Sequence, residues 1–190
     1  SALSIPALKG GVFRAADKDK IKNVVPIPRK VVKSGAVLEN VRQGDDINML
    51  EFPAPLLTEF DGGRYMGTDN GVIMKDQDEG WVNVGTYRMQ AQDDKSISLY
   101  ISPGKQGNVI RNKYFEKNLP CPVAVTFGHS PLLSMVFGTE TPYGICEYDY
   151  AGGLKGEPIE VIEGPVTGLP IPAHSEIAIE GYCYPGDNAP

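Results

Sequence analysis

The chain has 190 residues, which suits one domain with a substantial buried core, with or without a connecting arm. Its 41% hydrophobic and 22% charged residues are ordinary for a globular protein. The net charge of -6 argues against a nucleic-acid-binding protein, because contacts with phosphate backbones need a basic face. No apolar run reaches the roughly 18 residues that span a bilayer, so we expect neither a nucleic-acid partner nor a membrane.

Cysteine usage bears on the cellular compartment. Cys121, Cys146 and Cys183 are odd in number and lack a C-x-x-C spacing, which favours reduced thiols over a disulfide framework or a zinc site. The first residues also lack a charged start followed by a long apolar stretch, so we expect no secretory signal. These features together predict a cytoplasmic protein.

Residues 1–40 show repeated charges and several prolines but no sustained hydrophobic period. We interpret them as a connecting arm with at most one short edge strand near Val31. The compact body is predicted to cover residues 41–190, and Asp45 or Asp46 is suited to cap a turn at its start.

Strand patterns dominate this body. Ile97, Leu99 and Ile101 alternate with polar residues, which is the period-2 signature of a half-buried strand. The stretch before it, 81–92, is long, rich in β-forming residues and bounded by turn residues, so the two predict an antiparallel hairpin. The strands predicted in this way are 71–75, 81–92, 96–102, 122–127, 157–163 and 176–184.

Two helices are predicted between the strands. The first covers 108–118, and the second covers 131–137, where Ser130 and Pro131 provide a start and Gly138 a stop. Many strands, 22 glycines and 16 prolines at turn positions, and few helices predict a mainly β (α+β) fold. The expected architecture is a small antiparallel barrel or split β-barrel with short covering helices.

Common catalytic signatures are absent from the sequence: it contains no G-x-G-x-x-G, P-loop, G-x-S-x-G or H-E-x-x-H motif. Its two histidines offer little chemistry by themselves. His174 lies in a predicted turn and is expected to be solvated. For His129, just before a helix, a structural hydrogen bond is favoured over a ligand role.

The stretch Trp81-Val82-Asn83-Val84-Gly85-Thr86-Tyr87-Arg88 is the most informative. On one strand, Asn83, Gly85 and Tyr87 would share a face, with Thr86 and Arg88 on the other. A glycine inside a strand is costly unless a ligand or another backbone comes close. Arg88 suits a bidentate pair with a carboxylate or phosphate. Taken alone, a glycine bulge beside an edge-strand arginine explains the pattern better.

Two further positions allow both a functional and a structural interpretation. Gly104 and Lys105 precede a predicted helix, where backbone N–H groups can bind an anion, although a plain turn explains them equally well. Glu147 stands among apolar and aromatic residues. A carboxylate in such surroundings is usually paired, metal-bound or capping, because an isolated buried charge is unfavourable.

Several motifs together resemble the UbiD family of prenylated-FMN-dependent aromatic acid decarboxylases, over roughly residues 37–190. They occur in the family's order and spacing, and the branch that acts on hydroxylated benzoates (hydroxybenzoate, vanillate or gallate) is the most similar. The motifs are Asp61-Gly62-Gly63-Arg64-Tyr65, Asn83 to Arg88, Tyr100-Ile101-Ser102-Pro103-Gly104-Lys105, Cys121-Pro122-Val123-Ala124-Val125, Glu147-Tyr148 through Gly152-Gly153, and Ile179-Glu180-Gly181-Tyr182.

This resemblance implies a split barrel of the FMN-binding, flavin-reductase-like type. It implies prenylated FMN, a divalent cation (Mn²⁺ or Mg²⁺) and K⁺ as cofactors, with Asn83 and Glu147 as metal ligands. Arg88 would be the catalytic residue that holds the substrate carboxylate. The residues implied in cofactor binding are Asn83, Gly85, Thr86, Tyr87, Arg88, Gly104, Lys105 and Glu147.

The sequence departs from the family in two places. Lys105, or a residue beside it, stands near the position of a metal-binding histidine. The family pattern also continues after Pro190 with Glu-Gly-Pro-Phe-Gly-Glu, whose glutamates include the catalytic acid. We therefore expect the cofactor-binding core of a reversible aromatic acid decarboxylase, inactive as an isolated fragment.

Two alternatives stay open: a stand-alone flavin-binding subunit of a multi-chain carboxylase, and an FMN-dependent reductase on the same barrel. The partners that the resemblance implies are an aromatic carboxylic acid, a flavin prenyltransferase that supplies the cofactor, and other copies of the full-length chain.

Overall fold

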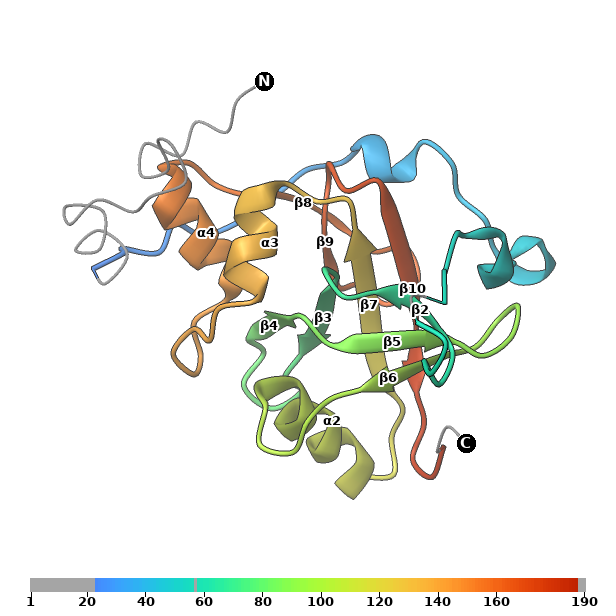
Figure 1. Cartoon of the computed structure of the whole chain (residues 1–190). Helices are drawn as coiled ribbons and strands as arrows, with labels where there is room; N and C mark the ends of the chain where they lie inside the picture. Colours follow the sequence, from blue (N-terminus) through green and yellow to red (C-terminus); the bar gives the residue numbers. More distant parts are fainter. Residues whose placement is uncertain (1–22, 57, 188–190) are drawn as a thin grey trace.

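The structure is a computed structural model that describes residues 23–56 and 58–187. Short strands dominate it, and three α-helices lie within the described residues (Figure 1). The strands are β1 (Lys30–Val31), β2 (Arg64–Gly67), β3 (Gly71–Lys75), β4 (Val82–Gly85), β5 (Arg88–Ala91), β6 (Ile97–Tyr100), β7 (Cys121–Phe127), β8 (Glu160–Glu163), β9 (Pro170–Pro172) and β10 (Ile177–Cys183). The α-helices are α2 (Gln106–Glu116), α3 (Pro131–Phe137) and α4 (Glu147–Lys155), and 3-10 turns cover Ala36–Leu38, Gly44–Asp46 and Met49–Glu51.

The described strands form three sheets. The central sheet has the order β10-β7-β3-β4 and is antiparallel throughout. A second antiparallel sheet has the order β2-β5-β6, and a third, β1-β8-β9, contains one parallel pair, β1 with β8. This arrangement confirms the predicted mainly β class with few helices.

Strand β3 explains how the central sheet builds a core on each face. Its first four residues are all buried, and successive side chains of a strand point to opposite faces. Ile73 packs with residues of α3 and α4 on one face, whereas Val72 and Met74 join a second cluster. That second cluster includes Ile110 of α2 and Met89 of β5. The sheet is therefore covered by α3 and α4 on one side, and by α2 and the small second sheet on the other.

The predicted continuous strand over 81–92 is wrong, because the chain leaves one sheet and enters another inside it. β4 ends at Gly85 and β5 begins at Arg88. Between them, the Thr86 N–H donates to the Phe137 carbonyl at 3.3 Å, and the Asn70 amide donates to the Tyr87 carbonyl at 2.8 Å. These groups bond outside the strand ladder, so the predicted alternation fails from Thr86 onward. The hairpin itself is confirmed for β5 and β6, where Arg88 faces Tyr100.

Helices α2 and α3 confirm the two predicted helices, and α2 begins two residues earlier than expected. Helix α4 was not predicted, because Gly152 and Gly153 lower helix propensity. Their role is close packing: a Cβ at Gly152 would lie 2.7 Å from the Ile27 carbonyl oxygen. The segment before β1 thus lies directly against α4. Strands β2 and β9, which contain glycine or proline, were also missed.

Residues 23–40 run along this body. The Ile27 N–H donates to the Asp149 carbonyl at 2.9 Å, and Val37 N–H donates to the Ala173 carbonyl at 3.3 Å. The domain boundary near residue 41 stays a prediction. Among the described residues, no helix is long and apolar enough to cross a membrane.

Candidate functional site

A buried polar cluster lies where the end of β4 meets the first residues of α2 and α4. We call it the oxygen cluster, and it consists of Asn83, Tyr87, Gln106, Thr141 and Glu147. Asn83, Thr141 and Glu147 are at most 3% exposed. The predicted pair of Asn83 and Glu147, 64 residues apart in the chain, is thus brought into direct contact.

Glu147 is the centre of the cluster. Its Oε2 accepts a hydrogen bond from the Val84 N–H at 2.6 Å, and its Oε1 accepts from the Thr141 hydroxyl at 2.6 Å and the Asn83 amide at 3.2 Å. Burial raises the pKa of the Glu147 carboxyl, and these donors only partly oppose that rise. The position at the first residue of α4 also favours negative charge, through the helix dipole.

The amide group of Asn83 lies between two acceptor oxygens. Its Nδ2 donates to Gln106 Oε1 at 2.8 Å and to Glu147 Oε1 at 3.2 Å. Gln106 is fixed in turn by its own Nε2, which donates to the Thr141 carbonyl at 3.0 Å. A positive group at the position of this amide nitrogen would therefore be within reach of two oxygens, one from the Glu147 carboxylate and one from the Gln106 side-chain carbonyl.

Tyr87 closes the cluster from the α2 side. Its hydroxyl donates to Asn83 Oδ1 at 3.3 Å and accepts from the Gly107 N–H at 3.2 Å. A Cβ at Gly85 would lie 2.7 Å from the Tyr87 ring, and one at Gly107 would lie 3.0 Å from it. An alanine at position 85 would thus force the Tyr87 ring to move. Burial raises the pKa of the Tyr87 hydroxyl, which keeps it protonated as a donor.

The other predicted site residues lie outside the oxygen cluster. Arg88 is exposed on β5, with its guanidinium 5.2 Å from the centre of the Tyr100 ring. Lys105 directly precedes α2 and forms an exposed ion pair with Glu140 at 3.4 Å. Gly104, beside it, adopts the left-handed conformation with φ of 84°. The half-buried Thr86 lies at the junction between the sheets. Of the predicted residues, Asn83, Tyr87 and Glu147 belong to the oxygen cluster, and Gly85 lies against the Tyr87 ring.

Gln106 and Thr141 are members that the sequence did not indicate. Gln106 immediately follows Lys105. The resemblance places a metal-binding histidine near this position, and the absence of that histidine was the one signal in the sequence that pointed to Gln106. Nothing in the sequence pointed to Thr141, because the loop before α4 brings it to Glu147.

The cluster fits a hard divalent cation. Within the described residues, Glu147 forms no ion pair with a lysine or arginine, so its buried charge has only neutral donors around it. The described residues also hold no group of three or more His, Cys, Asp or Glu side chains suited to a metal. The available ligands are one carboxylate and neutral oxygens from Asn83, Gln106 and Thr141, a set that suits Mg²⁺ or Mn²⁺. A half-turn of the Asn83 amide would present its oxygen to the ion.

Comparison with known proteins identifies the family. The profile of the UbiD domain, described as the 3-octaprenyl-4-hydroxybenzoate carboxy-lyase Rift-related domain, matches residues 29–190. This chain belongs to the UbiD family.

Several curated relatives are named as decarboxylases. The pyrrole-2-carboxylic acid decarboxylase of Pseudomonas aeruginosa is 34% identical over 156 residues, which are 82% of this chain and 32% of the relative. The phenolic acid decarboxylase of Sedimentibacter hydroxybenzoicus is 33% identical over 168 residues, which are 84% of this chain and 35% of the relative. The chain thus spans about a third of the length of the curated relatives it matches.

Solved structures agree with this assignment. The closed form of Sedimentibacter hydroxybenzoicus vanillic acid decarboxylase superposes with a TM-score of 0.83 at 30% identity, covering 92% of this chain and 39% of that one. An evolved dimeric form of the UbiD-class enzyme HmfF from Pelotomaculum thermopropionicum, in complex with prFMN, gives a TM-score of 0.81 at 26% identity. It covers 89% of this chain and 39% of that one.

Proposed function

We propose that this chain is the prenylated-FMN-binding core of a decarboxylase that acts reversibly on aromatic acids, with hydroxylated benzoic acids as the substrate class. The observation that carries the proposal is the buried Glu147 carboxylate, which has oxygen ligands beside it and no cationic partner among the described residues. Family membership, decarboxylase relatives and a similar structure in complex with prFMN support it.

Asn83, Gln106 and Glu147 would hold Mn²⁺ or Mg²⁺. The cation would offset the charge of the cofactor phosphate, which this acidic chain cannot easily neutralise alone. The segment of Gly85, Thr86 and Tyr87 passes along one side of the cluster. Its backbone, together with that of Gly104, would approach the cofactor. Lys105 would place its ammonium on the phosphate in exchange for its exposed pair with Glu140. Potassium is the second cation that the resemblance implies.

When bound, prenylated FMN supplies the electron sink that decarboxylation requires. Arg88 would hold the substrate carboxylate with its planar fork of donors. The Tyr100 ring beneath it limits the directions in which the guanidinium can point. Protonation of the carbon needs a positioned acid, and the resemblance places that glutamate in the segment that follows Pro190 in the family, so the 190 residues alone would be inactive.

The same proposal includes the finer architecture. We interpret the central sheet and the β2-β5-β6 sheet as walls of a split barrel of the flavin-reductase-like type. Residues from both sheets share one core cluster: Val72 and Val125 come from the first, and Met89 and Leu99 from the second. In the full-length protein we expect a homo-oligomer, a flavin prenyltransferase as supplier of the cofactor, and an aromatic carboxylic acid as substrate.

Flavin titration tests this proposal. FMN should bind to the purified chain in the presence of Mn²⁺ and K⁺, measured by quenching of flavin fluorescence, and chelation of Mn²⁺ should weaken the binding. The variants Asn83→Ala and Glu147→Gln should each bind FMN about tenfold or more weakly, the range expected when groups of a metal site are lost.

Asn112→Ala and Glu163→Gln are matched controls, because both side chains are exposed and lie outside the oxygen cluster. Equal FMN affinity in Glu147→Gln and the wild type would refute the metal-bridged site. Oxidation of NADPH by the FMN-loaded chain would instead favour the reductase alternative.

A further inference from the structure

Two of the three cysteines lie opposite each other on neighbouring strands. Cys121 is the first residue of β7 and Cys183 is the last residue of β10, and the antiparallel register pairs these two positions directly. All three cysteines are free thiols in the structure. The proposed function uses neither Cys121 nor Cys183, so this pair is available for chemistry of its own.

The two thiols share one face of the central sheet. Directly opposed residues of an antiparallel pair point to the same side, and both cysteines pack in the core cluster that contains Ile110 of α2. Burial, and after it the charge of the Cys183 thiol, raise the pKa of the Cys121 thiol to about 12. The register, the shared cluster and this electrostatic interaction agree in placing the two sulfur atoms beside each other.

The spacing of an opposed pair suits a disulfide. Such residues have Cα atoms about 4.5–5.5 Å apart, within the roughly 4.4–6.8 Å that disulfides span. Their Cβ atoms are about 4.5–5.5 Å apart, and a disulfide needs about 3.5–4.5 Å, so the Cβ atoms must approach by roughly 1 Å. Both cysteines end their strands, and the Cys121 thiol makes only a weak hydrogen bond, to the Pro122 carbonyl at 3.7 Å. A small shift at the strand ends is therefore sufficient.

Cys183 is the thiol that a reagent can reach first. It is partly exposed, whereas Cys121 is fully buried. Gly181 lies two residues earlier on the same face of β10, and an added Cβ at Gly181 would meet nothing within 4 Å. This face of the strand is thus open beside Cys183. The positive charge of Arg111 acts on both sulfurs and opposes the rise in pKa that burial causes, which favours the reactive thiolate.

We propose that Cys121 and Cys183 form a reversible disulfide when the chain meets a low-molecular-weight disulfide such as oxidised glutathione. The Cys183 thiolate attacks one sulfur of the reagent, which forms a mixed disulfide and releases one glutathione thiolate. The Cys121 thiolate then attacks the Cys183 sulfur, which forms the intramolecular bond and releases the second glutathione. Two electrons pass from the cysteines to the reagent, and the two cysteine protons go through water to the released thiolates. The bond clamps the start of β7 to the end of β10, where the chain leaves the sheet.

Thiol–disulfide exchange on the 190-residue chain tests this proposal. Oxidised glutathione at about pH 8.5, near the pKa of an ordinary thiol, should remove two thiols per chain and lower the mass by two hydrogen atoms, with no glutathione retained. Dithiothreitol should restore both thiols. Peptide mapping of the quenched and alkylated chain should find Cys121 linked to Cys183. Cys146 is an internal control, because it is buried in the other core cluster and should stay a free thiol.

Two variants separate the roles of the two thiols. Cys121→Ala lacks the second nucleophile, so one glutathione should accumulate on Cys183 and stay there. Cys183→Ala should take up no glutathione, because Cys121 is buried. The result does not depend on the proposed function, since no residue of the oxygen cluster takes part.

Three outcomes would overturn the proposal. The first is a wild type that keeps all three thiols or retains glutathione on Cys183, because the two sulfurs then do not meet. The second is a covalent dimer linked through Cys183. The third is a link through Cys146, because the thiols would then react only after the chain unfolds.

Discussion

At the scale of single residues, the buried carboxylate of Glu147 organises the candidate site. Val84, Thr141 and Asn83 all donate to it, yet its pKa is raised above the ordinary value of 4.5. These neutral donors thus offset only part of the free-energy cost of burying the charged carboxylate. A bound cation would supply the missing stabilisation, and this gives a measurable link between pH, metal and stability.

Without divalent metal, thermal stability of the chain should fall as pH rises from about 4.5 toward neutral. The folded state holds the Glu147 proton to higher pH than the unfolded state, so between the two pKa values the native protein binds more protons and unfolding becomes easier as pH increases. Glu147→Gln should flatten this part of the profile. Calorimetry over a pH series that begins near the ordinary carboxyl pKa of 4.5 and rises from there measures the difference.

Addition of Mn²⁺ at neutral pH should raise the melting temperature of the wild type by roughly 5–10 °C. A ligand at about 100 times its dissociation constant contributes about 2.7 kcal/mol, and about 1 kcal/mol corresponds to roughly 2–4 °C at this chain length. The Glu147→Gln variant should gain little, whereas the exposed control Glu163→Gln should gain as much as the wild type. An equal gain in all three proteins would place the metal elsewhere.

At the scale of secondary-structure elements, the sequence predicted the types of the long elements better than their connections. Strands β3, β7 and β10 and helices α2 and α3 were identifiable, because their apolar periodicity, proline and glycine positions are local signals. The break between β4 and β5 was not identifiable. It depends on hydrogen bonds from Asn70 and to Phe137, and the second of these residues is about 50 positions away in sequence.

In the candidate site too, residues in a recognisable motif were predicted, whereas contacts between distant parts of the chain were not. Asn83 and Glu147 were predicted from a resemblance and lie in contact. Helix α4, which positions Glu147, was missed because its two glycines serve packing against the segment before β1. For Gly85 the sequence suggested a nearby ligand or another backbone and did not indicate the Tyr87 ring, which occupies the space beside Gly85 in the structure. Intramolecular contacts of this kind leave no periodic trace in a sequence.

Gly85→Ala should therefore destabilise the chain by about 1–3 kcal/mol, as expected when an added methyl group forces a packed ring to move. The new Cβ would lie 2.7 Å from the Tyr87 ring. Gly181→Ala in β10 is the matched control, since nothing lies within 4 Å of its added Cβ, and its effect should stay within about 0.5 kcal/mol.

A double-mutant cycle with Tyr87→Ala identifies the cause, measured by urea unfolding. If the ring is what Gly85 accommodates, the alanine at position 85 should cost much less in the Tyr87→Ala background, with a coupling of about 1 kcal/mol or more. Additive effects of the two substitutions would show that the backbone at position 85, and not Tyr87, requires glycine.

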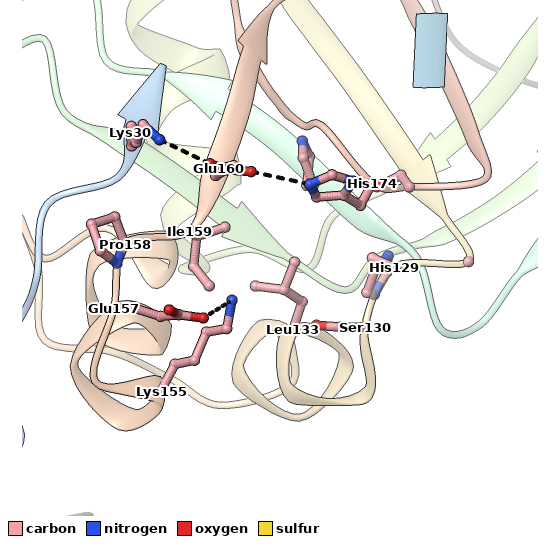
Figure 2. Close-up of a pocket in the computed structure, with 13 residues that line it drawn as sticks. Lys30, His129, Ser130, Leu133, Lys155, Glu157, Pro158, Ile159, Glu160 and His174 are labelled. Carbon is pink, nitrogen blue, oxygen red and sulfur yellow. Dashed lines mark hydrogen bonds and ion pairs between the residues drawn. The ribbon is translucent and has the colours of Figure 1, made fainter. Parts of the chain in front are cut away.

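At the scale of the whole molecule, a buried polar cluster and a pocket lie at opposite ends of helix α4. The oxygen cluster joins β4 to the starts of α2 and α4, and the pocket lined in part by Leu133, Lys155 and Glu157 lies at the C-terminal end of α4 (Figure 1, Figure 2). The first has a buried carboxylate that is surrounded by neutral donors, while the second has ion pairs at its rim.

The 190-residue chain by itself should release CO₂ from hydroxybenzoates at least about 100-fold more slowly than a full-length relative, even when loaded with prenylated FMN, Mn²⁺ and K⁺. A positioned acid typically contributes on the order of 10²–10⁴ in rate. The carboxylates near the oxygen cluster are engaged otherwise: Glu147 is buried among its donors, and Glu140 is exposed and paired with Lys105. Glu180 accepts from Thr167 and Val166, away from this cluster. Because the chain covers only 39% of the vanillic acid decarboxylase structure, the surfaces that would exclude water in such an enzyme are also largely outside the matched region.

The measurement is CO₂ release from a panel of hydroxybenzoates, with the loaded Arg88→Ala variant as a background control. Turnover that matches the relative and disappears in Glu180→Gln would show that this glutamate is the acid, and that the chain is catalytically sufficient.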